Sequence, residues 1–193
     1  MKLTRLSSSP VFLAGLLFLA GCASPEPHYH TLAPERIMLP PLPAQPRWIE
    51  VSPPAVPASL DRVQLVLRRE DGGVRRLESE RWSAALPDEL RDALSLQLQA
   101  RLGAVDLYRR GAAGEAPLYR ISAEVLRLEA GPTGVEVAVS WTVRRLPDGA
   151  AHSGLSRYRR AMPAATAEAA VAAYREGLTQ VGEEIVAALE GLR

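Results

Sequence analysis

The only thiol of this 193-residue chain is Cys22, and its position limits the chemistry that it can carry out. It follows Leu19-Ala20-Gly21 and an apolar run of ten residues, Val11–Ala20, which a short basic start precedes. This order is typical of a secretory signal. The run is too short to span a bilayer as a helix, which takes about 20 apolar residues. We therefore expect residues 1–21 to be a cleaved signal peptide.

The cysteine after small residues resembles the lipobox of bacterial lipoproteins, in which it is lipidated and becomes the first mature residue. We predict palmitate-type acyl chains on Cys22, which would anchor firmly because about 0.8 kcal/mol accumulates for each buried methylene. An ordinary signal peptide with a chance cysteine is the alternative. If Cys22 carries lipid, no thiol remains for a disulfide, a thiolate metal site or a cysteine nucleophile.

The three histidines are the other candidates for acid–base or metal chemistry. His28 and His30 lie in a proline-rich segment without further ligands at metal spacing. His152 has no serine or aspartate at motif spacing, although a Ser-His-Asp site assembles in space and not in sequence. The chain also lacks a Gly-x-Ser-x-Gly elbow and a phosphate-binding glycine loop. We therefore predict no enzyme, cofactor or metal, with a periplasmic hydrolase at His152 as a minor alternative.

The charge of the mature chain argues against a nucleic-acid partner. Of the 23 basic residues, Lys2 and Arg5 lie in the signal, which leaves 21 against 22 acidic residues. A nearly neutral chain has no net field to hold a polyanion. The arginine pairs along the chain are therefore interpreted as solvated faces.

A cluster of arginine and aromatic residues is the candidate partner surface. It comprises Asp61, Arg62, Arg68, Arg81 and Trp82. Tryptophan and arginine dominate the energetics of many protein interfaces. The structural alternative is that Asp61 pairs with an arginine and that Trp82 covers the first hairpin.

The elements that position these residues start with a tether. Prolines recur through residues 22–46 and favour an extended chain, which would reach roughly 75 Å if it were fully extended. Tyr29-His30-Thr31-Leu32 interrupts the prolines with bulky residues, and it either docks as a short edge strand or remains linker. The globular domain is expected over residues 47–193.

Within that domain the pattern predicts strands, a helix, a strand meander and a second helix. Strands are expected at 48–51, 63–69, 74–78 and 105–108, then at 119–125, 135–144 and 151–162. Pro87 opens a helix with acids in its first turn, and Gly103 ends it. Thr166 caps the last helix, whose apolar residues recur every three or four positions. That spacing fits packing on a sheet or a coiled-coil seam, and we favour the sheet. The fold class is α+β, one two-layer domain with a mostly antiparallel sheet and two packed helices.

Several segments of the sequence resemble the PqiC/YmbA family of ABC-type transport auxiliary lipoproteins. The resemblance rests on Tyr29-His30-Thr31-Leu32, on Leu60–Arg68, on Arg81–Leu86 and on Trp141, in that order along the chain. The departures are Val63 and Ala85, where the family often has proline. They affect backbone stiffness and not chemistry.

The resemblance implies an accessory role in lipid transport across a Gram-negative envelope. Such lipoproteins lie on the periplasmic face of the outer membrane, work with an MCE-domain protein and ABC transporter components to maintain membrane integrity, and can form homo-oligomeric rings. Ala23 is compatible with outer-membrane sorting, because aspartate there is the usual inner-membrane retention signal. A stand-alone structural envelope lipoprotein, which binds peptidoglycan or assists outer-membrane assembly, is the alternative.

Overall fold

The structure is a computed structural model that describes residues 26–34, 36–111 and 117–192, so the lipobox and Cys22 lie outside the described residues. Eight strands and two helices follow one another in these ranges. Their bounds are His28–His30 (β1), Arg47–Val51 (β2), Gln64–Arg68 (β3), Val74–Trp82 (β4), Leu86–Leu102 (α2), Ala104–Asp106 (β5), Leu118–Gly131 (β6), Gly134–Leu146 (β7), Ala151–Arg160 (β8) and Ala167–Gly191 (α3).

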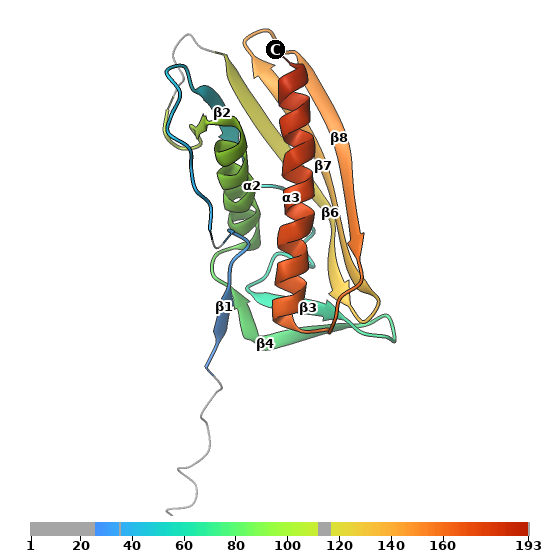
Figure 1. Cartoon of the computed structure of the whole chain (residues 1–193). Coiled ribbons are helices and arrows are strands. Elements are labelled where there is room, and N and C mark those ends of the chain that lie inside the picture. The colour runs from blue at the N-terminus through green and yellow to red at the C-terminus, as the bar shows by residue number, and fades with distance from the viewer. Residues whose placement is uncertain (1–25, 35, 112–116, 193) are drawn as a thin grey trace, which may run out of the picture.

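The strands form two sheets. The larger has the order β5-β2-β6-β7-β8, in which β6, β7 and β8 are an antiparallel meander and β2 runs parallel to both of its neighbours. The smaller has the order β1-β4-β3 and crosses one end of the molecule (Figure 1). The α+β class and the meander are confirmed, whereas the parallel pairs and the separate small sheet were not predicted.

The starts of both helices and the end of α2 lie where the sequence predicts them. Asp88 and Glu89 lie in the first turn of α2, and Gly103 ends it with φ of 58°, in the left-handed region that glycine adopts readily. The Thr166 Oγ1 atom accepts the N–H of Ala169 at 3.3 Å and caps α3. Neither helix of the described ranges is both long and apolar enough to cross a membrane.

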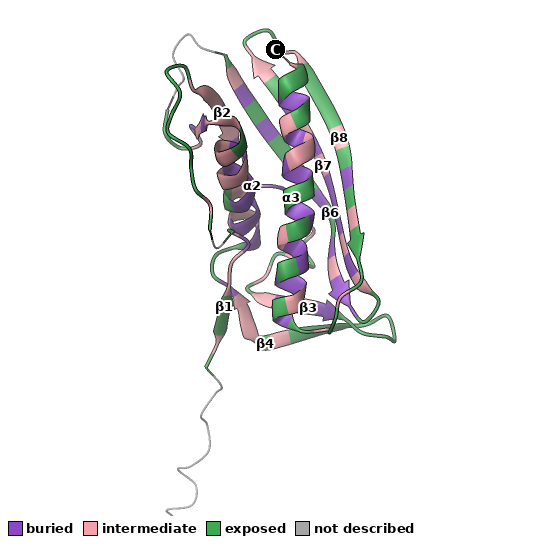
Figure 2. Cartoon of the chain, viewed as in Figure 1, coloured by how far each residue is buried: buried purple, intermediate pink, exposed green. Residues whose placement is uncertain are grey.

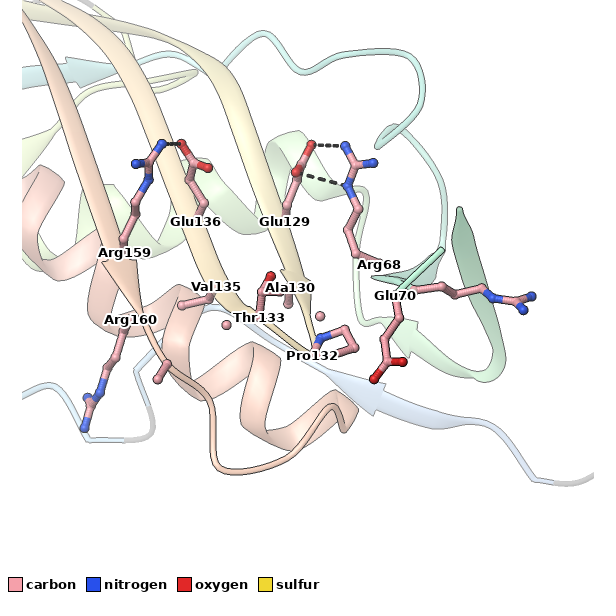
Figure 3. Close-up of a pocket in the computed structure, with 14 residues that line it drawn as sticks. Arg68, Glu70, Glu129, Ala130, Pro132, Thr133, Val135, Glu136, Arg159 and Arg160 are labelled. Atoms are coloured by element: carbon pink, nitrogen blue, oxygen red, sulfur yellow. Dashed lines mark hydrogen bonds and ion pairs between the residues drawn. The ribbon is translucent and has the colours of Figure 1, made fainter. Parts of the chain in front are cut away.

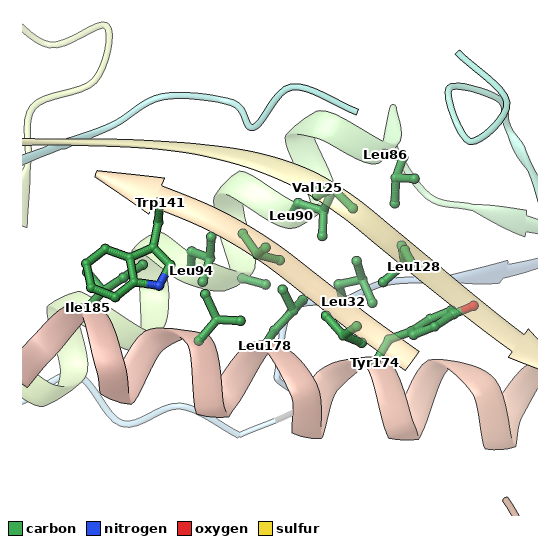
Figure 4. Packing of buried hydrophobic residues seen from close by; sticks show 14 of the residues in the cluster. Leu32, Leu86, Leu90, Leu94, Val125, Leu128, Trp141, Tyr174, Leu178 and Ile185 are labelled. Atoms are coloured by element: carbon green, nitrogen blue, oxygen red, sulfur yellow. The ribbon is translucent and has the colours of Figure 1, made fainter. Parts of the chain in front are cut away.

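The core lies between the larger sheet and the two helices. α3 lies along β7 and β8, and α2 lies beside it over β2 and β5 (Figure 1). Leu178 and Ile185 of α3 enter one continuous apolar cluster with Leu94 of α2 and Trp141 of β7 (Figure 4). Along β6, buried residues alternate with exposed or half-buried ones over most of the strand, as a half-covered sheet requires (Figure 2). The spacing in α3 therefore reflects packing on the sheet and not a coiled-coil seam.

Part of the expected tether is packed on the domain. β1 pairs in parallel with the end of β4, and Leu32 behind it is 1% exposed. Tyr29-His30-Thr31-Leu32 thus adopts the first of its two alternatives, an edge strand followed by a core residue. Beyond Leu32, the segment that leads to β2 runs outside α2 and is mostly exposed (Figures 1 and 2).

Candidate functional site

The β3–β4 hairpin brings the candidate partner residues to one end of the molecule. Gln64 stands opposite Arg81, and the N–H of Trp82 donates to the carbonyl oxygen of Val63 at 2.8 Å. The segment before β3 therefore lies beside the end of β4. Arg68 closes β3 at the far end of the same hairpin, opposite Val74.

Arg68 joins the smaller sheet to the larger one. Its guanidinium donates from Nη2 and Nε to the two carboxylate oxygens of Glu129 on β6, at 2.7 and 3.1 Å (Figure 3). These charged hydrogen bonds hold the pKa of Glu129 below its ordinary value and raise the pKa of Arg68. The two backbones approach closely here, since a Cβ atom on Gly131 would stand 2.7 Å from the Cβ of Arg68. Arg68 is therefore already paired within the domain.

Trp82 supports the hairpin from inside. Its side chain is buried, and its ring centroid lies 6.5 Å from that of Tyr174 on α3. Burial also raises the pKa of the Tyr174 hydroxyl, chiefly through desolvation. This placement agrees with the structural alternative, in which Trp82 covers the hairpin. Partner contact through Trp82 stays a prediction.

Arg62 borders an apolar hollow of about 230 Å³. The hollow is lined by Ser59, Leu60, Arg62, Val66, Arg68, Val74, Leu128, Glu129 and Ala130. The Arg62 Nε atom is buried and has no hydrogen-bond partner within the described part of the chain. Since a buried donor without an acceptor costs free energy, Arg62 has hydrogen-bonding capacity that the described part of the domain does not satisfy. Of the five candidate residues, Arg62 has the clearest unmet hydrogen-bonding capacity.

Asp61 and Arg81 complete the set. Asp61 is exposed in the turn before β3, and Arg81 is half-buried with its Nε donating to the carbonyl oxygen of Glu78 at 3.3 Å. The structure thus places Asp61, Arg62, Arg68 and Arg81 on one hairpin and its approach. Their role in partner binding stays a prediction.

A larger and more open hollow of about 560 Å³ lies where this hairpin meets the β6–β7 turn (Figure 3). Glu129 and Glu136 face it, and each carries an arginine, with Glu136 accepting from Arg159 at 2.8 Å. Arg160 at its edge pairs instead with Glu176 on α3. Because these charges are compensated, the hollow presents little net field to an ion.

Two carboxylates that sequence reasoning missed hold the N-terminal segment. Glu89 is buried and accepts from Thr31 Oγ1 and Leu32 N on one oxygen, and from Ser83 Oγ and Ala84 N on the other. The sequence indicates Glu89 only as an acid in the first turn of a helix. Its role as a buried acceptor depends on Thr31 and Leu32, which are distant in the chain, so no local pattern predicts it.

The second missed carboxylate is Glu80. It bonds His28 Nδ1 at 3.1 Å and His30 Nε2 at 2.6 Å, and the bond to His30 contributes most to lowering the pKa of Glu80. The two histidines are two positions apart, so an edge strand places them on one face. Two histidines at this spacing in a possible edge strand therefore indicate a shared partner.

The residues considered for catalysis or metal binding lie elsewhere. His152 stacks on Trp141 with ring centroids 5.9 Å apart. Ser156 accepts from Trp141 Nε1 at 2.8 Å and donates to Glu184 at 2.5 Å. Within the described ranges, no three His, Cys, Asp or Glu side chains are grouped as metal ligands would be.

Comparison with known proteins connects this arrangement to a family. A family model described as "ABC-type transport auxiliary lipoprotein component" matches residues 30–186. A crystal structure of an uncharacterized protein superposes with a TM-score of 0.63 at 17% identity, covering 83% of this chain and 97% of that one. Protein XCC0632 from Xanthomonas campestris, of family model DUF330, superposes with a TM-score of 0.60 at 19% identity, covering 82% and 92%. No curated protein sequence matches.

Proposed function

Because this chain belongs to the family of ABC-type transport auxiliary lipoprotein components, we propose that it is a non-catalytic docking or capping subunit of an MCE/ABC-type intermembrane lipid transport system. Lipid on Cys22 holds it on the periplasmic face of the outer membrane. The observation that carries this proposal is the family match, which spans nearly the whole described domain.

Three features support the finer parts of the proposal. Cys22 follows a lipobox-like sequence, and Ala23 after it lacks the aspartate that retains lipoproteins in the inner membrane. The segments that resemble the family, Leu60–Arg68 and Arg81–Leu86, form the β3–β4 hairpin and the start of α2. The resemblance to this family also implies that the partners are an MCE-domain protein and the ABC components of the same system.

The packing of the larger sheet favours docking over carrying lipid inside the domain. The apolar face of β7, with Val135, Val137 and Val139, is buried in the core that α3 covers. Acyl chains would have to displace α3 to reach this face. A domain whose apolar sheet face is already covered serves better as a contact for a transport channel than as a container for its cargo.

Lipid attachment and sorting can be tested with radiolabelled palmitate in cells. We expect label on the wild-type chain and none on Cys22→Ser, which tests the anchor. Separation of the two membranes on a density gradient should place the wild type in the outer membrane and Ala23→Asp in the inner one. Unlabelled wild-type protein, or wild type in the inner membrane, would contradict the proposed anchor or address. Co-purification of the MCE-domain protein tests the partnership.

A further inference from the structure

The lipid anchor of the proposed function joins the domain through a very short segment. β1 is fixed by its pairing with β4 and by the bonds of His28 and His30 to Glu80. Five residues separate Cys22 from His28, so six residue steps join them. At about 3.6 Å for each extended residue, they span at most about 20 Å. The end of the domain that carries β1 is therefore held within that distance of the membrane surface.

The smaller sheet is the part of the domain at that end. β1 lies on β4, and the β3–β4 hairpin crosses the same end of the molecule, where α3 begins (Figure 1). The opposite end carries the β7–β8 turn and the C-terminal end of α3, whose 25 residues correspond to about 37 Å of helix. A short anchor at one end of an elongated domain fixes which end faces the membrane.

One face of the β3–β4 hairpin is turned away from the core. Register pairs Val66 with Arg76 and Arg68 with Val74, so these four side chains share a face. Leu65 and Leu67, on the other face of β3, are buried in the core. We call the first set the outer face.

The outer face carries exposed apolar side chains, and the approach to it carries Arg62, an arginine whose hydrogen-bonding capacity is unmet. Val74 is 61% exposed, and Val63 just before β3 is 53% exposed. The Arg62 hollow opens between this face and β6, with its buried Nε lacking an acceptor. Arg68 and Arg76 of the outer face pair with Glu129 and Glu78, whereas Arg62 in the approach to β3 forms no ion pair in the described part of the chain. Phosphate oxygens are strong acceptors for arginine, and interfacial acyl chains accommodate exposed valines.

We propose that the outer face and the Arg62 hollow lie on the membrane that holds the anchor, with a phospholipid phosphate accepting from Arg62. The proposal rests on lipid attachment at Cys22. A membrane is favoured over a protein partner because the anchor segment brings this face to the lipid surface and leaves little room for a protein between them. The hollow is also smaller than the roughly 300 Å³ at which small-molecule pockets begin. It therefore has room for part of one lipid at most.

The test uses the full-length lipidated protein in vesicles of phosphatidylethanolamine and phosphatidylglycerol. With Cys22 acylated, Val74→Cys supplies a single free thiol for an environment-sensitive fluorophore. Ala151→Cys, exposed at the start of β8 beside the distal turn, is the matched control. We expect a lipid-borne quencher to quench the Val74 probe at least threefold more strongly than the Ala151 probe. Arg62→Gln should reduce this contrast at least twofold, and Arg144→Gln near the distal turn should leave it unchanged.

The possible outcomes separate this inference from the proposed function. Protein that does not float with the vesicles lacks the anchor, which overturns the proposed function and this inference with it. Vesicle-bound protein with equal quenching at both positions leaves the anchor intact and overturns the orientation. Shielding of the Val74 probe only after the MCE-domain protein is added would make this face a protein docking surface, and the inference would be wrong.

Discussion

The carboxylate of Glu89 accepts the backbone N–H of Leu32 at 2.7 Å, and this bond fastens the N-terminal segment to the first turn of α2. The same group accepts three other hydrogen bonds, including one from Ala84 N at 3.1 Å. The segment that follows the proposed anchor is thus part of the folded domain. If Cys22 carries lipid, a force applied to the lipid would reach the folded core through the segment that contains Leu32.

Replacing Glu89 with glutamine should destabilise the domain by roughly 2 to 4 kcal/mol, because one acceptor oxygen becomes a donor facing buried donors. Urea unfolding of the full chain measures this loss. Asp88→Asn makes the same chemical change in the same turn and should cost less than about 1 kcal/mol, the usual scale of a helix-dipole contribution. Equal losses in the two variants would show that the buried acceptor role is wrong.

Truncating Leu32 tests whether the N-terminal segment contributes to the core. Leu32→Ala removes a side chain that is 1% exposed, and we expect a loss of about 2 to 5 kcal/mol in free energy of unfolding. Leu39→Ala, on the exposed connecting segment, is the matched control and should stay within about 0.5 kcal/mol. A loss below about 1 kcal/mol for Leu32→Ala would place this segment outside the cooperative core.

The bonds of Glu80 predict a pH dependence with a definite sign. The pKa of Glu80 is lowered in the folded state, chiefly by its bond to His30, so its contribution is fully present above the unfolded pKa of about 4.3. The contribution is lost as the pH falls through the lower folded pKa. Wild type should thus exceed Glu80→Gln in stability at pH 6, and the difference should shrink steadily below about pH 4.3. Urea midpoints that differ by a constant amount from pH 3 to pH 7 would contradict this.

Two glycines of α3 allow a matched test of its packing on the sheet. A Cβ atom on Gly177 would stand 2.8 Å from Val137 Cγ2, whereas one on Gly191 would meet nothing within 4 Å. Alanine gains up to about 1 kcal/mol of helix propensity at either position. At Gly177 the overlap should outweigh that gain, with a net loss of about 1 to 2 kcal/mol. Thermal unfolding should therefore show Gly177→Ala below wild type and Gly191→Ala at or above it.

Elements with local signals were predictable from the sequence. The hairpin over 63–78, the helix that ends at Gly103, the meander and the Thr166 cap all depend on residues close together in the chain. The parallel pairing of β2 with β5 and β6 depends on contacts between distant segments, and no local pattern encodes it.

The sequence indicated that several candidate residues flank one hairpin, but not which contacts they make. Asp61 and Arg62 precede β3, whose Gln64 stands opposite Arg81, because one hairpin carries both strands. The sequence did not indicate that Glu129, more than 60 positions away, would pair with Arg68. The sequence also did not indicate that Trp82 is a core residue or that Arg62 keeps an N–H without an acceptor. The burial of Trp82 depends on packing against α3, which lies at the far end of the chain.

Co-purification tests the central claim most directly. Full-length tagged protein would be isolated in a mild detergent from envelope membranes of cells that make it, with Cys22→Ser as the unanchored control. The account predicts that an MCE-domain protein, with ABC components, is recovered with the wild type and falls at least fivefold with Cys22→Ser. Recovery of wild-type protein from the outer membrane without any MCE or ABC component would contradict it.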